Sequence, residues 1–220
     1  MKRMMVGSMI VLVCAALFSA VPLSLWSLQP AHAEENSADA TCGTVRDLPA
    51  KECAALVALY RSTDGANWLD NANWLATSTA CEWTGVICND DHVVELYLPN
   101  NGLRGSLPAE LTDLTAVEFL DFSANDLHGK LPAGLTALHQ LEEIYLADTG
   151  LEGVVDDSFG SLENLTLLDV TNTTICMEPM VHASAWLENL DHDESDVAIH
   201  FCGDDLQLDQ QIFLPIVTGQ

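Results

Sequence analysis

VVELYLPNNGLRGSLPAELTDLTA (93–116) is followed directly by VEFLDFSANDLHGKLPAGLTALHQ (117–140), LEEIYLADTGLEGVVDDSFGSLEN (141–164) and LTLLDVTNTTIC (165–176). The first three segments have 24 residues each, and the fourth begins the same pattern. A fixed period without insertions is typical of stacked structural units that share one core, so residues 93–176 are predicted to form a solenoid of about 3.5 to 4 coils.

Apolar residues recur at seven positions of this repeat. The columns are Val93/Val117/Leu141/Leu165, Leu96/Leu120/Ile144/Leu168, Leu98/Phe122/Leu146/Val170, Leu103/Leu127/Leu151/Ile175, Leu107/Leu131/Val155, Leu111/Leu135/Phe159 and Leu114/Leu138/Leu162. A single unit of this length cannot enclose a core. Neighbouring coils are therefore expected to bury these columns against one another.

The columns also predict how each coil is built. Leu96 and Leu98 flank Tyr97, and this alternation predicts a short strand with one buried face. Gly105, Gly129 and Gly153 each follow a loop leucine by two residues, where they are expected to make a tight turn. The Leu-x-x-Leu spacing that follows predicts an irregular or 3₁₀-like return path.

Two asparagines stand among the apolar columns. Asn101 and Asn125 occupy one repeat position, and the same position holds Thr149 and Thr173 in the next two coils. Because buried polar side chains need hydrogen-bond partners, these residues are predicted to bond the backbone of a buried turn.

The pattern LxxLxLxxNxLxGxLPxxLxxLxx resembles the plant-type leucine-rich-repeat class. ECAALVALYRSTDGANWLDNANWL (52–75) and CEWTGVIC (81–88) resemble the N-terminal cap of that class. Val155-Asp156 departs from the pattern, which has an apolar residue and Pro there. The resemblance implies an α/β solenoid, a short right-handed coil with a parallel concave β-sheet and a cap at each end. It also implies the roles of known members, which are receptor ectodomains, secreted inhibitors of cell-wall hydrolases and bacterial secreted proteins.

Residues 1–33 are predicted to be a secretory signal peptide. Lys2 and Arg3 precede an apolar run over 4–28, and Ala31-His32-Ala33 forms a small-x-small cleavage site. An uncleaved membrane anchor is the alternative. The expected location is extracytoplasmic, either secreted or at the cell surface, and no transmembrane span is expected in the mature chain.

The mature chain, 34–220, is strongly acidic. It holds five basic and 33 acidic residues, and five minus 33 gives a formal charge of −28. Such a charge repels nucleic acid and anionic membranes, so neither is expected as a partner. A cationic or Ca²⁺-bridged partner fits the charge, as does a surface that is merely kept soluble.

Six cysteines of the mature chain lie outside the interior coils, and an even number in an exported protein predicts disulfides. The neighbouring pairs are Cys42/Cys53, Cys81/Cys88 and Cys176/Cys202. A zinc site fits poorly, because no Cys-x₂-Cys pair occurs and the histidines do not cluster. No metal and no cofactor is expected.

The repeats are predicted to lie between two caps, 34–92 and 177–209, and an apolar tail follows at 210–220. A helix is expected to begin near Pro49 and to end at Asp64-Gly65, with an apolar face of Ala54, Ala55, Leu56, Leu59 and Tyr60. Trp68, Trp74 and Trp83 are expected to cover the first coil, and a tryptophan-lined sugar site is the alternative reading.

The C-terminal cap is expected to contain a second helix over 178–190. Its apolar residues recur at helical spacing at Met180, Ala183, Trp186, Leu187 and Leu190. DHDESD (191–196) is interpreted as a solvated acidic turn, since the glycine and the terminal glutamate of an EF-hand loop are missing. The apolar run of the tail is too short to span a bilayer.

No catalytic motif stands out in the chain. Gly-x-Ser-x-Gly, HExxH and P-loop patterns are absent, and no carboxylate pair can be singled out among so many. The chain is therefore predicted not to be an enzyme, with an acidic hydrolase as the remote alternative. Asn164 and Asn172 begin glycosylation sequons, which matter only in a eukaryotic secretory pathway.

The residues that alternate with the strand leucines are the candidate ligand-binding positions. The resemblance places them on the concave face, and they are Glu95, Tyr97, Phe119, Asp121, Glu143, Tyr145 and Asp169. The column Asn100/Ala124/Asp148/Asn172 is assigned to the same face. Tyrosine offers rigid amphipathic area, and carboxylates bind Arg, Lys or sugar hydroxyls. An acidic sheet surface without a ligand is the alternative.

The sequence thus predicts a non-enzymatic exported recognition module that binds a protein, a peptide or a cell-wall glycan. A structural or adhesive protein of the cell envelope is the alternative function.

Overall fold

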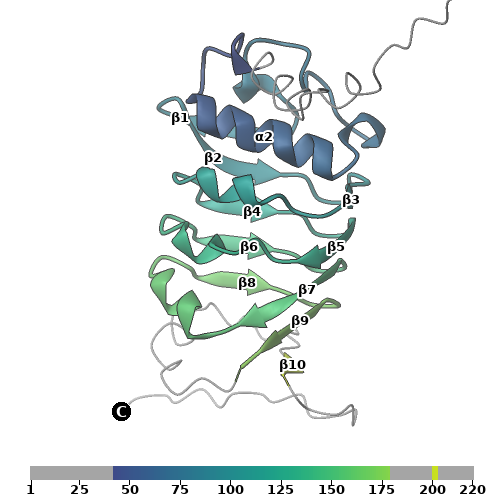
Figure 1. The fold of residues 1–220 in the computed structure, drawn as a ribbon, viewed down its shortest axis with the longest axis vertical. Coiled ribbons are helices and arrows are strands. Elements are labelled where there is room, and N and C mark those ends of the chain that lie inside the picture. The colour runs from purple at the N-terminus through teal and green to yellow at the C-terminus, as the bar shows by residue number, and fades with distance from the viewer. Residues whose placement is uncertain (1–41, 179–199, 203–220) are drawn as a thin grey trace, which may run out of the picture. The chain divides into compact units, whose positions relative to one another are not determined.

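The computed structural model describes residues 42–178 and 200–202. The predicted signal peptide, the C-terminal helix over 178–190 apart from Glu178, the acidic turn and the apolar tail lie outside the described residues. Figure 1 shows stacked coils that begin below helix α2, Ala50–Ser62. Two short 3₁₀ helices, η2 (Gly65–Asn67) and η3 (Ala80–Glu82), connect α2 to the first strand.

The first sheet contains one strand from the cap and one from each coil. Its order is β1-β2-β4-β6-β8, and all neighbours are parallel except β1 and β2. The strands are β1 Val86–Asn89, β2 His92–Tyr97, β4 Phe119–Asp121, β6 Glu143–Tyr145 and β8 Leu167–Asp169. Equal repeat positions pair with one another, so the 24-residue period sets the register.

A second parallel sheet was not predicted from the sequence. Its order is β10-β9-β7-β5-β3. The strands are β3 Arg104–Gly105, β5 Asp126–Lys130, β7 Gly150–Val155, β9 Thr174–Met177 and β10 His200–Phe201. In Figure 1 its strands β5, β7 and β9 lie toward the right of the view, and the 3₁₀ helices of the coils lie toward the left.

This second sheet corrects the prediction of tight turns at Gly105, Gly129 and Gly153, which lie in strands instead. Gly105 and Gly129 do have positive φ angles, +130° and +84°, whereas Gly153 does not. In each coil the segment around the glycine is extended and lies beside the same segment of the next coil. Backbone groups of neighbouring coils therefore pair there, although these residues do not show the apolar alternation of a strand.

The return path of each of the three complete coils is a 3₁₀ helix, as predicted. These helices are η4 Ala109–Asp113, η5 Leu135–Ala137 and η6 Asp157–Ser161. Helix α2 packs beside η4, so the cap continues the layer that the return paths form.

The seven apolar columns form the core. Every member is buried except Leu131, which is partly exposed. A buried Leu contributes about 1.5–3 kcal/mol relative to an exposed one, so the columns supply most of the favourable free energy that holds the coils together.

The side chains at the asparagine position form hydrogen bonds with the backbone of the turn, as predicted, but their partners change along the chain. Asn125 Oδ1 accepts hydrogen bonds from the backbone N–H groups of Asn101 (3.0 Å) and Leu103 (2.9 Å) in the preceding coil. Thr149 and Thr173 donate only to a carbonyl of their own coil. The coil-to-coil bonds of this position therefore end after Asn125.

The tryptophans of the N-terminal cap are buried against one another, with Trp68 edge-on to Trp74 at 4.9 Å between ring centroids and Trp83 tilted against Trp74 at 5.0 Å. Trp68, Trp74 and Trp83 are 5%, 4% and 1% exposed. Their indole N–H groups donate to Thr63 O, Thr84 O and Thr77 Oγ1. The capping interpretation is confirmed, and a tryptophan-lined sugar site is ruled out by this burial.

Disulfides join the cysteines in the predicted pairs. The Cα atoms of Cys42 and Cys53 lie 5.7 Å apart, and those of Cys81 and Cys88 lie 5.6 Å apart. Cys176 in β9 is bonded to Cys202. Two disulfides therefore hold the N-terminal cap, and the third ties Cys202 to the last strand of a coil.

A buried carboxylate of α2, which was not predicted from the sequence, fastens the helix to the first sheet. The Glu52 side chain is 4% exposed, and its Oε1 lies 2.6 Å from His92 Nδ1. Its Oε2 accepts the backbone N–H of Val93 at 2.8 Å. The hydrogen bond to Glu52, followed by the negative charge of Glu52, raises the pKa of His92 above its ordinary value of 6.5.

This pair should make stability depend on pH. Because the pKa of His92 is higher in the folded state, its contribution is complete below pH 6.5 and is lost as the pH rises through the folded-state pKa. We expect the difference in unfolding free energy between wild type and His92→Gln to shrink between about pH 6 and pH 9. Urea unfolding at each pH measures it. In a Glu52→Gln background the difference should stay flat, and an equal decline there would disprove the assignment.

Candidate binding surface on the first sheet

The strand register brings the predicted binding residues together. Glu95, Phe119, Glu143 and Leu167 form one row across the sheet, and Tyr97, Asp121, Tyr145 and Asp169 form a second row. They flank the buried column that contains Leu96, so their side chains project from the other side of the sheet. Neighbouring strands lie about 4.8 Å apart, which makes the rows one continuous surface. We call it the aromatic–acidic face, defined by Glu95, Tyr97, Phe119, Asp121, Glu143, Tyr145 and Asp169.

Three aromatic rings run across this face. The ring centroid of Phe119 lies 6.3 Å from that of Tyr97 and 5.5 Å from that of Tyr145. Tyr97 is 54% exposed, although large apolar side chains are normally covered. The rings offer rigid contact area at the surface.

Asp121 lies between the two tyrosines in the register and is only 8% exposed. Its Oδ1 accepts the backbone N–H of Ser123 at 2.9 Å and the Ser123 hydroxyl at 2.6 Å. In the same row, Asp169 Oδ1 accepts the backbone N–H of Thr171 at 3.0 Å. Both aspartates are thus held by the turn that follows their strand.

The Tyr145 hydroxyl donates to Glu143 Oε2 at 2.9 Å. Burial, with smaller contributions from this hydrogen bond and from the charges of Glu143, Asp121 and Asp169, raises the pKa of Tyr145 to about 12. The phenol therefore stays protonated at neutral pH, and it holds the Glu143 carboxylate in one position.

No basic side chain neutralises this face within residues 42–178. Lys51 lies 4.0 Å from Asp113, and Arg104 lies 2.9 Å from Asp126 in the second sheet. Glu118 and Glu142 are exposed immediately before Phe119 and Glu143 and add to the negative charge.

One predicted column does not belong to the face. Asn100, Ala124, Asp148 and Asn172 follow the strands in a turn, with φ angles of +47°, +54°, +56° and +56°. This turn, rather than the glycines, reverses the chain after each strand of the first sheet. Asn172 Nδ2 donates to Asp148 Oδ1 at 2.8 Å, so the exposed turns also stack on one another.

Ile87 is a neighbour of the face that was not among the predicted binding residues. Ile87 pairs with Glu95 across β1 and β2, and it is 45% exposed while the adjacent Val86 is buried. Its alternation with Val86 could have indicated this position, but the segment was interpreted only as part of the cap.

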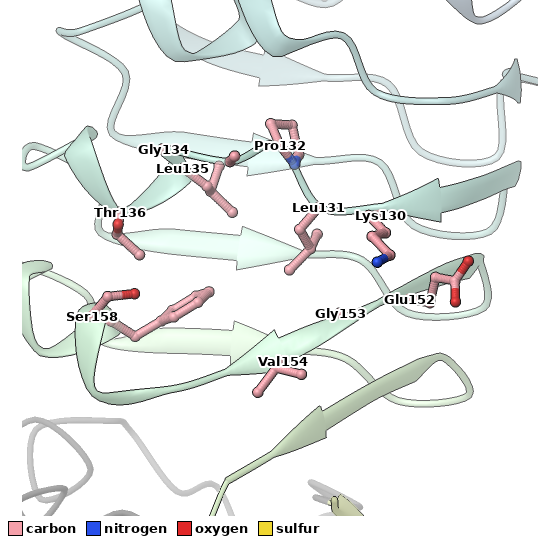
Figure 2. A pocket seen from close by; sticks show the side chains of 12 residues that line it. Lys130, Leu131, Pro132, Gly134, Leu135, Thr136, Glu152, Gly153, Val154 and Ser158 are labelled. Carbon is pink, nitrogen blue, oxygen red and sulfur yellow. The ribbon is translucent and has the colours of Figure 1, made fainter.

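A hollow of about 460 Å³ lies away from the first sheet, among η5, η6, β5 and β7. Figure 2 shows Leu131 and Val154 along it, with Lys130 and Glu152 toward one side. Gly153 leaves room there, since a Cβ at this position would lie 3.3 Å from Leu131. The hollow thus explains why Leu131 alone among the columns is partly exposed.

The described part of the chain contains no group of three or more His, Cys, Asp or Glu side chains that could hold a metal ion. None of its helices is both long enough and apolar enough to cross a membrane.

Comparison with known proteins gives matches to receptors of one plant. A probable leucine-rich-repeat receptor-like protein kinase of Arabidopsis thaliana is 33% identical over 83 residues, covering 32% of this chain and 9% of the relative. Phytosulfokine receptor 2 of the same plant is 40% identical over 57 residues, covering 24% of this chain and 6% of the receptor. The chain thus spans less than a tenth of the length of these relatives. No family model matches the chain.

Among solved structures, a plant ice-binding protein shares the fold. It has a TM-score of 0.52 and 24% sequence identity, covering 60% of this chain and 43% of that protein. Together with the 24-residue repeats and their parallel strands, these matches show that the chain has a leucine-rich-repeat fold and that its sequence is similar to plant leucine-rich-repeat receptors.

Proposed function

We propose that this protein is a non-enzymatic, exported recognition module that binds a protein, peptide or cell-wall glycan through the aromatic–acidic face. The observation that carries the proposal is the row of rings at Tyr97, Phe119 and Tyr145, set among carboxylates that no described basic side chain neutralises. Aromatic side chains are the usual anchors of binding surfaces, and these rings, of which Tyr97 is exposed while Phe119 and Tyr145 are half-buried, lie outside the apolar columns of the core.

The sheet favours binding because it holds these side chains in place before a ligand arrives. Strands β2, β4 and β6 each lie between two neighbours and β8 pairs with β6, and Asp121, Asp169 and Glu143 are further held by the hydrogen bonds described above. A surface that is already ordered loses little conformational entropy on binding, which favours affinity.

The disulfides and the relatives support export and recognition. Disulfides persist in oxidising, extracytoplasmic compartments. The matched relatives are named as receptors or receptor-like kinases, and the similarity covers only a small part of each. On the face itself no histidine stands beside a hydroxyl or a carboxylate, so the residues offer contacts rather than a nucleophile with its base.

Replacing both Tyr97 and Tyr145 by Ala should weaken binding to the ligands that wild-type protein selects on peptide and glycan arrays. Each substitution should cost about 1 kcal/mol or more of binding free energy, the usual effect of losing an aromatic anchor. Affinities of the selected peptides or glycans are then measured in solution. The thermal unfolding of the variant should change little, because neither ring belongs to a buried column.

Leu69→Ala is the matched control, because Leu69 is 77% exposed in the cap and lies off the face. It should leave these affinities unchanged. If the double tyrosine variant binds every selected ligand as tightly as wild type does, the proposed site is wrong.

A further inference from the structure

We infer that the ligand of the aromatic–acidic face is a basic, extended peptide segment, with a Lys or Arg side chain placed against Asp121 among Tyr97, Phe119 and Tyr145. This inference rests on the proposed function and names the class of ligand for the same surface.

Asp121 is more than nine-tenths buried, and its Oδ1 accepts two hydrogen bonds from Ser123. Its Oδ2 accepts no hydrogen bond from any residue that the structure describes, and no described cation pairs with it. A buried carboxylate without a cation is unfavourable, and one partner for its second oxygen would remove that penalty. A basic side chain of a ligand supplies both the charge and the donor.

The rings around Asp121 suit the same group. Phe119 lies within 6.3 Å of both tyrosine rings, and Asp121 occupies the register position between these tyrosines. Ring faces attract Lys and Arg cations over about 6 Å, most strongly where water is excluded. Arginine is favoured over lysine, because its planar guanidinium can stack on a ring while it donates to a carboxylate.

The wider charge of the face selects against other ligands. Glu95, Glu143 and Asp169 surround the rings, and the whole chain carries a formal charge of −26. This field raises the local concentration of cations and repels acidic peptides and acidic glycans. A neutral glycan would gain ring contacts but would leave Asp121 without a counter-charge.

The repeat also predicts the spacing of the basic residues in the ligand. Asp121 and Asp169 lie in the same row with one strand, β6, between them. Two strand spacings amount to about 9.6 Å. In a polyproline II segment, residues i and i+3 point the same way and lie about 9.3 Å apart. An Arg-x-x-Arg segment that crosses the strands can therefore reach both aspartates.

The test uses synthetic proline-rich decapeptides with two Arg residues at spacing i, i+3, and identical peptides in which both are Gln. Titration calorimetry with the purified full-length protein should show at least tenfold tighter binding of the Arg peptide, and its affinity should fall as salt is raised. Peptides with Arg at i, i+2 should bind more weakly than those at i, i+3.

Asp121→Asn should reduce affinity for the Arg peptide at least tenfold. The amide oxygen can still accept both bonds from Ser123, so the turn is kept and only the charge is lost. Asp126→Asn is the matched control, because it removes the same charge from an exposed position in the second sheet and should leave the affinity unchanged.

Each failure has a distinct meaning. If the Arg peptides bind no more tightly than the Gln peptides, or if array ligands are neutral glycans, the inference of a basic ligand is wrong. The proposed function still stands in that case, provided that replacing Tyr97 and Tyr145 lowers the affinity for those ligands. If Asp121→Asn and Asp126→Asn lower the affinity for the Arg peptide equally, the loss comes from the change in overall charge, and the role assigned to Asp121 is wrong.

Discussion

Gly105→Ala should lower the unfolding free energy by about 4 kcal/mol, since it combines backbone strain with a steric clash. Gly105 has a φ of +130°, a conformation that residues with a side chain rarely adopt. A Cβ there would lie 2.1 Å from the carbonyl oxygen of Ser62, at the last residue of α2. Urea unfolding followed by tryptophan fluorescence measures the effect, because the tryptophans of the cap lie close to this junction.

The cap cannot simply move away from the new methyl group. Arg104 N donates to Thr63 O at 2.9 Å, and Ser106 N donates to Ser62 O at 3.3 Å. These bonds on both sides of Gly105 hold the end of α2 against β3. A shift that relieved the clash would break them and would also disturb the Glu52–His92 contact at the other end of the helix.

Gly129→Ala separates the two causes of this loss. Gly129 occupies the same repeat position one coil later and has a φ of +84°, but the nearest atom to its Cβ would be Ser106 Cβ at 3.6 Å. Gly129→Ala should therefore lower the unfolding free energy through backbone strain alone, by about 1–2 kcal/mol. If both variants lose the same stability, close contact with the cap does not explain Gly105.

The period of the sequence was sufficient to predict much of this fold and the layout of the face. An uninterrupted 24-residue repeat lets only equal positions meet in neighbouring coils. The pairing of Tyr97 with Asp121, and of Asp121 with Tyr145, follows from that rule alone. The burial of the columns follows as well, because an alternating strand leaves one face for the core.

Other features depend on contacts that no local pattern contains. The pairing of Arg104 with Asp126 in the second sheet uses backbone groups, and these residues carry no apolar alternation. Glu52 looks like an ordinary exposed residue of a helix until His92 and Val93 are placed against it. Asp121 is likewise only 8% exposed beside Tyr97 and Tyr145 of the adjacent strands, and the repeat pattern alone did not indicate this burial.

Asn125→Ala should destabilise the protein by about 4 kcal/mol, because it leaves several buried backbone groups without partners. Asn125 Oδ1 accepts two N–H groups of the preceding coil, as described above, while its Nδ2 donates to Leu98 O and Phe122 O at 2.9 Å each. An unsatisfied buried group costs about 1–3 kcal/mol, and relaxation keeps the total below a simple sum. The midpoint and slope of urea unfolding give the change in free energy.

Asn125→Thr should lose less stability than Asn125→Ala, because the chain itself shows what Thr can do at this position. Thr149, one coil later, donates its hydroxyl to Leu146 O at 2.7 Å, and Leu146 is the repeat equivalent of Phe122. A Thr at 125 can therefore keep the bond within its own coil while the bonds to Asn101 and Leu103 are lost. Thr149→Ala, which removes a single bond, should cost only about 1 kcal/mol. If Asn125→Ala costs no more than Thr149→Ala, the coils are held together by their apolar columns alone and the asparagine bonds across them add nothing measurable.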